Sequence, residues 1–226
     1  MIDVLHALDL GVSQSALGNL FFEFWRSPLS KERNRKLKTV ELWNLVKEYY
    51  KEFRPPTKIN ALTVEMVEQD GKSPKFRGKG AETRHLVPFG LILAEKMAAA
   101  AGGTSIFYNQ LAIMMRHLLA FYQTFTETTF NPKTASNAAN QFCQIYAWFN
   151  KTATHEGLWK FKPKFHLFVH LAEDQCLING NPARFGAFMD EDFVGFIATI
   201  AVARGGKRIA ITIPVNVIDK YRSSAV

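Results

Sequence analysis

The sequence contains only two cysteines, Cys143 and Cys176, among its 226 residues. Two widely spaced cysteines do not make a disulfide framework, so we expect a reducing, intracellular environment. The longest apolar run, residues 193–203, is shorter than the ~18 residues needed to cross a bilayer. The N-terminus carries Asp3 and His6 where a signal peptide has a basic lead and an apolar run. We therefore expect an intracellular protein without a membrane partner, nuclear if its source is a eukaryote.

Signatures of common cofactors are missing as well. The sequence has no GxGxxG fingerprint, Walker loop or GxSxG nucleophile elbow, which argues against conventional cofactor and hydrolase chemistry. Acidic residues are outnumbered, with 20 Asp and Glu against 28 Lys and Arg and a formal net charge of +8. This balance favours a polyanionic partner such as DNA, although solvated surface charge explains it equally well.

The residues that are present predict a helical fold. Hydrophobic residues make up 47% of the chain, and 19 of the residues are Phe, which is enough for an aromatic-rich core. Apolar side chains recur at three-to-four spacing along most of the chain, so the fold class is predicted to be all-α, an irregular multi-helix bundle. The predicted helices cover residues 4–27, 30–53, 63–68, 81–100, 104–125, 134–153, 164–175 and 190–203, and one strand-like segment covers 208–213.

Breakers and capping residues predict where these helices end. Ser30 and Thr104 are predicted to cap their helices, and Pro88 is predicted to be tolerated inside residues 81–100. A basic loop over 71–80, rich in Gly and Pro, is predicted to separate an N-terminal helical part (1–70) from a C-terminal helical part (81–226). We expect the parts to form one compact domain.

Two stretches of the chain are crowded with basic residues. One lies at the start of the second predicted helix and the other in and beside the basic loop. If these side chains contact phosphates, they form the DNA-binding surface; the alternative is solvated surface charge. The candidate DNA-binding residues are Lys31, Arg33, Arg35, Lys36, Lys38, Lys75, Arg77 and Lys79.

Three short motifs could carry chemistry. Asp3 and His6 share a helix face, where they could orient each other or simply start the helix. His166 and His170 have the four-residue spacing of two metal ligands on one helix, or of two packed histidines. Glu191 lies in the acidic run 190–192, which could hold Mg²⁺ or cap a helix.

In this order, the three segments resemble motifs of eukaryotic cut-and-paste DNA transposases of the CACTA-like and hAT-like groups. Asp3-x-x-His6 is similar to their acid-or-cysteine-x-x-His motif. The run Lys-Pro-Lys-Phe-His-Leu-Phe-Val-His-Leu at 162–171 resembles their Lys-Pro-Lys-x-His-x-x-x-His-Leu run. Glu191 falls on the third catalytic acid of the family, and Val194 replaces an Asn of the family pattern.

The resemblance implies metal-dependent phosphoryl transfer on DNA by intact relatives, with paired Mg²⁺ ions. Catalytic roles would fall on Glu191 as a metal ligand and on Asp3 and His6 near the DNA. In the family, however, an RNase H-like sheet carries the first two acids ahead of the Asp-x-x-His motif, where this chain begins. We therefore expect the chain to resemble the helical insertion and C-terminal helices of such an enzyme.

The resulting interpretation is a transposase-derived fragment of a mobile element that binds DNA and is catalytically incomplete alone, without a tightly bound metal. One alternative is a helical protein–protein interaction or structural module without catalysis. Another is a metal hydrolase that uses His166 and His170. Homo-oligomerisation stays open.

The resemblance makes a prediction about activity. Purified protein supplied with Mg²⁺ or Mn²⁺ should neither nick nor join DNA, because one glutamate cannot hold two ions without the other two acids. Conversion of supercoiled plasmid on a gel measures this. Robust metal-dependent cleavage that a mock preparation lacks would contradict the prediction.

Overall fold

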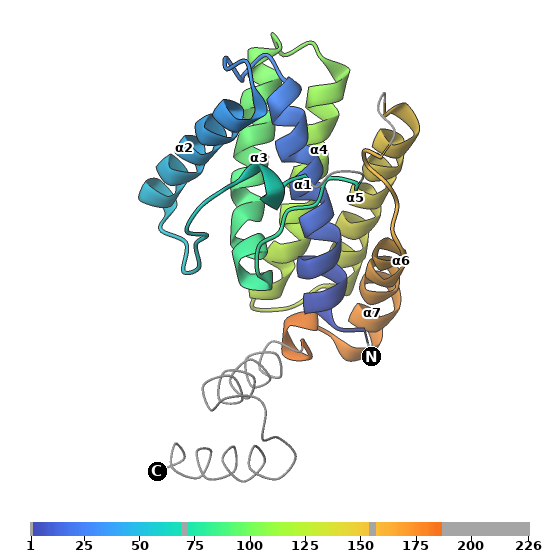
Figure 1. Ribbon diagram of the computed structural model, residues 1–226. Coiled ribbons are helices and arrows are strands. Elements are labelled where there is room, and N and C mark those ends of the chain that lie inside the picture. The colour runs from blue at the N-terminus through green and yellow to red at the C-terminus, as the bar shows by residue number, and fades with distance from the viewer. Residues whose placement is uncertain (1, 69–71, 154–156, 187–226) are drawn as a thin grey trace, which may run out of the picture. The chain divides into compact units, whose positions relative to one another are not determined.

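The computed structural model describes residues 2–68, 72–153 and 157–186 (Figure 1). Packing divides the chain into two units, Met1–Phe185 and Gly186–Val226. All regular elements of the described residues are helical, which confirms the all-α prediction for them. No helix among them is long and apolar enough to cross a membrane. The predicted helix at 190–203 and the strand-like segment at 208–213 lie outside the described residues.

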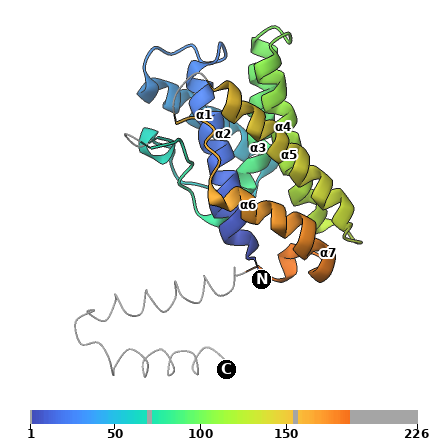
Figure 2. The ribbon, with the colours of Figure 1, turned by 90° about the vertical axis from the view of Figure 1, so that its right-hand side faces the viewer.

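The first helical segment lies inside the bundle (Figures 1 and 2). A π-helical segment, η1 (Leu5–Ser13), continues directly into α1 (Gln14–Arg26), so the single helix predicted over 4–27 is confirmed. Its apolar spacing indicated one buried stripe, and that interpretation is wrong. Residues 11–25 are all buried, because neighbours cover the helix on every side.

Helix α2 (Arg35–Phe53) begins later than predicted. Asn34 caps it, with its side chain accepting a hydrogen bond from the Leu37 backbone N–H at 2.9 Å. The prediction that Ser30 caps this helix is therefore wrong; the Ser30 hydroxyl donates to Glu41 instead. The helix ends at Arg54, whose φ of 47° is left-handed, before the Pro-Pro pair.

Helices α3 (Gly80–Ala100) and α4 (Ile106–Gln123) pack against each other as a helical hairpin. Pro88 stays inside α3, as predicted. One turn before it, the Tyr49 hydroxyl donates to the His85 carbonyl at 3.2 Å, near the place where a proline interrupts the helical hydrogen bonds. Ser105, not Thr104, caps α4 by accepting from the Tyr108 N–H.

The C-terminal part of the bundle consists of α5 (Pro132–Thr152), α6 (Pro163–His170), the π-helical η4 (Leu171–Gln175) and α7 (Cys176–Asn179). The predicted helix at 164–175 corresponds to α6 and η4. The helix predicted over 63–68 is only a short 3₁₀ turn, η2 (Val64–Met66). Two further 3₁₀ turns, η3 (Thr124–Thr126) and η5 (Pro182–Arg184), follow α4 and α7. Aromatic rings fill the core between α4, α5 and α6; its fully buried members include Phe121, Phe142, Phe149, Phe165 and Phe168.

The predicted basic loop forms an extended segment across α1, here called the strap (residues 72–79). The Phe76 N–H donates to the Gln14 carbonyl of α1 at 2.8 Å. Along its other edge, the Lys75 and Arg77 N–H groups donate to the carbonyls of Val67 and Met66, each at 2.9 Å. These bonds hold the strap against the central helix.

The crossing of strap and helix requires glycine at position 18. A Cβ atom there would lie 2.4 Å from the Lys75 Cα and 2.5 Å from the Phe76 backbone nitrogen. At Gly90 of α3 a Cβ would instead meet the flexible ends of side chains, Met115 Cε at 2.6 Å and Leu17 Cδ2 at 2.9 Å.

We expect Gly18→Ala to lower the free energy of unfolding by ~2 kcal/mol more than the control Gly90→Ala. Both substitutions gain about 1 kcal/mol of helix propensity, so the difference reports the contacts. Backbone atoms of the strap cannot move aside as a methionine methyl can. Urea denaturation followed by circular dichroism measures both values. Equal losses in the two variants would contradict the close approach of the strap.

Candidate functional site

The strap presents cations, among them Lys75 and Arg77, on the side opposite the core. Phe76 points inward and is fully buried, with its ring edge-on to Phe21 at a centroid distance of 5.7 Å. Alternate side chains of an extended chain face opposite ways, so Lys75 and Arg77 lie on the outer side. Lys75 is half-buried and Arg77 is exposed.

The start of α6 brings two further cations to the same region. Pro163 is the first helical residue, which suits its fixed φ, and Lys162 precedes it as the N-cap. The aliphatic stem of Lys164 packs on Gly11, where an added Cβ would lie 2.8 Å from Lys164 Cδ. The Lys164 ammonium donates to the Leu10 carbonyl at 3.2 Å, which places it beside η1.

Lys75, Arg77, Lys162 and Lys164 therefore form a cluster, here called the basic cluster. Burial lowers the pKa of Lys75, and the charges of Lys164, Lys162 and Arg77 lower it further. Burial and the Arg77 charge likewise lower the pKa of Lys162. None of the four forms an ion pair with an acid within the described part of the chain.

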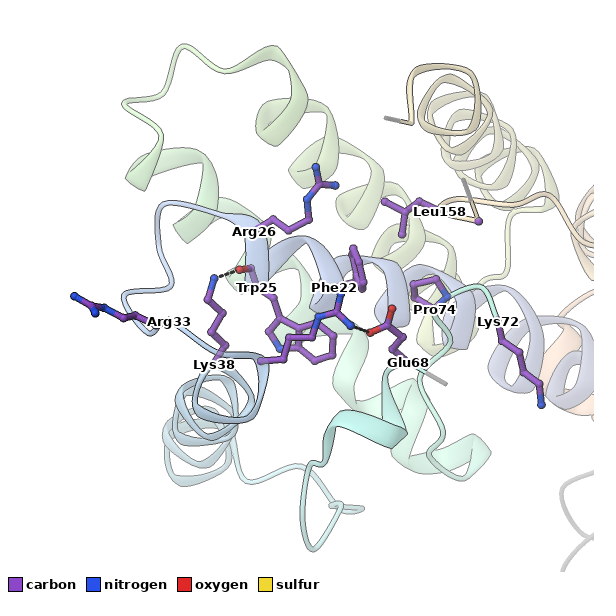
Figure 3. Close-up of a pocket in the computed structure, with 11 residues that line it drawn as sticks. Phe22, Trp25, Arg26, Arg33, Lys38, Glu68, Lys72, Pro74 and Leu158 are labelled. Atoms are coloured by element: carbon purple, nitrogen blue, oxygen red, sulfur yellow. Dashed lines mark hydrogen bonds and ion pairs between the residues drawn. The ribbon is translucent and has the colours of Figure 1, made fainter. Parts of the chain in front are cut away.

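A cavity of about 440 Å³ adjoins the other end of the strap (Figure 3). Its walls include Phe22 and Trp25 of α1, and the Arg35 guanidinium lies 5.5 Å and 5.8 Å from the centroids of these rings. Glu68, the one acid among the described residues that line it, forms an ion pair with Arg35. The lining cations are Arg26, Arg33, Arg35, Lys38 and Lys72. We call this the arginine cavity.

The structure thus divides the predicted DNA-binding residues among three places. Arg33, Arg35 and Lys38 line the arginine cavity, and Lys75 and Arg77 belong to the basic cluster. The others, Lys31, Lys36 and Lys79, are exposed and line neither. Sequence reasoning missed Arg26, Lys162 and Lys164 as members of these sites, although the Lys-Pro-Lys run carried a visible signal.

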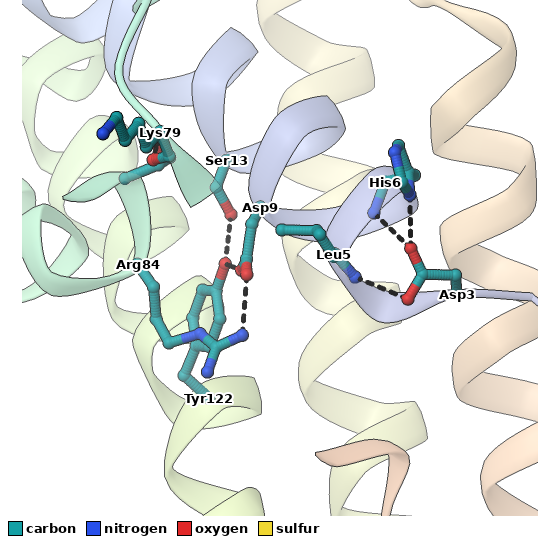
Figure 4. Close-up of polar contacts among 9 residues, drawn as sticks. Asp3, Leu5, His6, Asp9, Ser13, Lys79, Arg84 and Tyr122 are labelled. Carbon is teal, nitrogen blue, oxygen red and sulfur yellow. Dashed lines mark hydrogen bonds and ion pairs between the residues drawn. The ribbon is translucent and has the colours of Figure 1, made fainter. Parts of the chain in front are cut away.

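Asp3 and His6 lie together at the start of η1 (Figure 4). The Asp3 carboxylate accepts hydrogen bonds from the backbone N–H groups of His6 at 3.0 Å and Leu5 at 3.3 Å, as a helix cap does. It also contacts His6 Nδ1 at 2.5 Å. Asp3 therefore caps the start of the helix and also contacts the His6 imidazole, as both sequence interpretations expected. Glu191 lies outside the described residues, so its metal-ligand role stays a prediction.

A buried polar network that sequence reasoning missed lies farther along η1 (Figure 4). Asp9 is fully buried and forms a 2.7 Å ion pair with Arg84 of α3. The Tyr122 hydroxyl of α4 donates to Asp9 and is 2.8 Å from the Ser13 hydroxyl. Burial raises the pKa of Asp9, an effect that Arg84 and Tyr122 oppose. In the sequence, the feature that pointed to this network is an acid, Asp9, between two apolar residues, Leu8 and Leu10.

Comparisons of the chain with protein-family models, with curated proteins and with solved structures return no match.

The Asp9 network makes a stability prediction. Tyr122→Phe should lower the free energy of unfolding by ~1–3 kcal/mol, because it leaves a buried carboxylate oxygen without its hydroxyl donor. The matched control is Tyr108→Phe, since the half-buried Tyr108 hydroxyl has no hydrogen-bond partner among the described residues. Denaturant unfolding at neutral pH compares the two variants. A loss in Tyr122→Phe no larger than in the control would show that the network contributes nothing.

Proposed function

We propose that the protein is a transposase-derived helical module that binds duplex DNA through its phosphates, with the basic cluster as the main contact. The observation that carries the proposal is the convergence of four cations that form no ion pair within the described residues, from two segments far apart in sequence. The transposase part rests on the motifs at 3–6 and 162–171. The DNA-binding part rests on the charge of the folded surface.

The electrostatics of the basic cluster favour an anionic partner. Burial and the three neighbouring like charges lower the pKa of Lys75, so keeping this amine charged raises the free energy of the folded protein. An approaching phosphate would reverse the effect, since a negative charge stabilises the protonated amines. Lysine and arginine side chains that contact DNA phosphates also displace the condensed counterions, and the release of these ions favours binding.

The arginine cavity offers a second contact for the same duplex. Lys72 lines the cavity and Lys75 belongs to the cluster. Three extended residues cover only ~10 Å, well within one turn of B-DNA. Neither group of side chains presents an obvious base-reading set, so we expect binding with little sequence preference.

Binding to a duplex should weaken steeply between about 50 and 200 mM salt, since each phosphate contact adds about −0.9 to the log–log salt slope. Lys75→Met together with Lys164→Met should make that slope shallower by about 2. Lys96→Met, which removes an exposed charge from α3, should change it little. Fluorescence anisotropy of a labelled duplex at several salt concentrations measures all three. Salt-independent binding, or no binding at about 50 mM salt, would favour the protein–protein module instead.

Lys75 should also affect the stability of the free protein. The pKa of Lys75 is lower in the folded protein than in the unfolded chain, so its charge opposes folding at all pH values below the folded pKa. This penalty fades as the pH rises from the folded pKa to about 10.5. Lys75→Met keeps most of the aliphatic stem and should raise the melting temperature at pH 7. A lowered melting temperature would mean that the ammonium group stabilises the fold.

A further inference from the structure

His166 and His170 lie one turn apart on the outer face of α6 with their rings turned toward each other. The two Nε2 atoms are 3.1 Å apart, and the ring planes are inclined at 82°. His170 Nδ1 is 2.6 Å from a carboxylate oxygen of Asp174, one further turn along. Both imidazoles reach solvent; the His170 side chain is 46% exposed. The apolar partners Phe165 and Phe168, fully buried on the inner face, fix the helix that carries them.

The separation of the two Nε2 atoms suits a shared metal ion. With metal–nitrogen bonds of ~2.0–2.1 Å, a 3.1 Å separation corresponds to a nitrogen–metal–nitrogen angle of roughly 100°. That value lies between the octahedral and tetrahedral angles. Without an ion, one Nε2–H must instead donate to the other Nε2, an arrangement that uses one tautomer of each ring.

Asp174 supplies the outer contact that metal-bound histidines commonly have. A carboxylate that accepts from Nδ1–H fixes the imidazole tautomer and leaves Nε2 free to bind a metal. His170 has this partner at 2.6 Å, so its Nε2 lone pair is directed to the side where His166 lies. The pair is therefore oriented before any ion arrives.

We propose that His166 and His170 form a two-histidine site for a divalent transition-metal ion, Zn²⁺ in the test below, with Asp174 as its positioning residue. Imidazole nitrogen prefers zinc, copper and nickel to the magnesium of phosphoryl transfer, so this site differs from the one that the transposase resemblance implies. No group of three or more metal-binding side chains gathers within the described residues. The ion keeps open positions for water or an external donor.

Zinc titration of the full chain against a competing fluorescent chelator tests the site at neutral pH. The wild-type chain should bind one Zn²⁺ ion per molecule. His166→Gln and His170→Gln should each weaken binding at least tenfold, because a single imidazole remains. Asp174→Asn should weaken it about tenfold, the lower end for an outer contact because Asp174 is 60% exposed. Unchanged affinity in Asp174→Asn would overturn the positioning role.

A histidine on another helix provides a matched control. His117→Gln on α4 should leave the affinity unchanged. Far-ultraviolet circular dichroism checks that each variant keeps its helices. Stoichiometric binding that survives His166→Gln with His170→Gln would place the ion elsewhere and overturn the site, as would absence of binding at a tenfold excess of zinc. The experiment contains no DNA, so its outcome is independent of the proposed function.

Discussion

The fold depends on a helical segment whose residues 11–25 are all buried although several of them carry polar side chains. Apolar packing around such a helix is non-directional and sets its rotation and register only loosely. Hydrogen bonds from the polar residues supply the direction. Asp9 bonds to Arg84 of α3, Gln14 donates to the Gly78 carbonyl of the strap at 2.7 Å, and Asn19 accepts from the Trp159 N–H at 2.8 Å. Each bond ties η1 or α1 to a different neighbour.

The contacts of the central helical segment with its neighbours explain why the four side chains of the basic cluster come together. The strap is bonded to α1 at Gln14 and passes close to it at Gly18, while α6 packs on η1 at Gly11. Two glycines in the central segment therefore admit a backbone and a lysine stem that larger residues would exclude. The strap and the start of α6 then carry their charges to the same region of the surface. The basic cluster is a consequence of how the central helix is covered.

Helix α6 carries two kinds of chemistry on separate faces. Lys164 lies toward η1, where its ammonium donates to a carbonyl, and the two histidines lie toward solvent. Phosphate oxygens are suitable partners for the lysine ammonium group, and a transition-metal ion such as Zn²⁺ is a suitable partner for the imidazoles. Burial raises the pKa of Cys143 and Cys176 to about 12, so both thiols stay protonated at neutral pH.

Among the described residues, the sequence by itself determined the long helices, because helical periodicity, capping residues and breakers act over a few residues. It was wrong where several capping residues competed, at Ser30 against Asn34 and at Thr104 against Ser105. Local spacing also predicted Lys75 and Arg77 as candidates, but it could not show that residues 162 and 164 join them. Only the tertiary structure decided that meeting, the burial of Asp9 and the facing histidine rings. Each depends on contacts between distant segments or on side-chain rotamers, which no local pattern encodes.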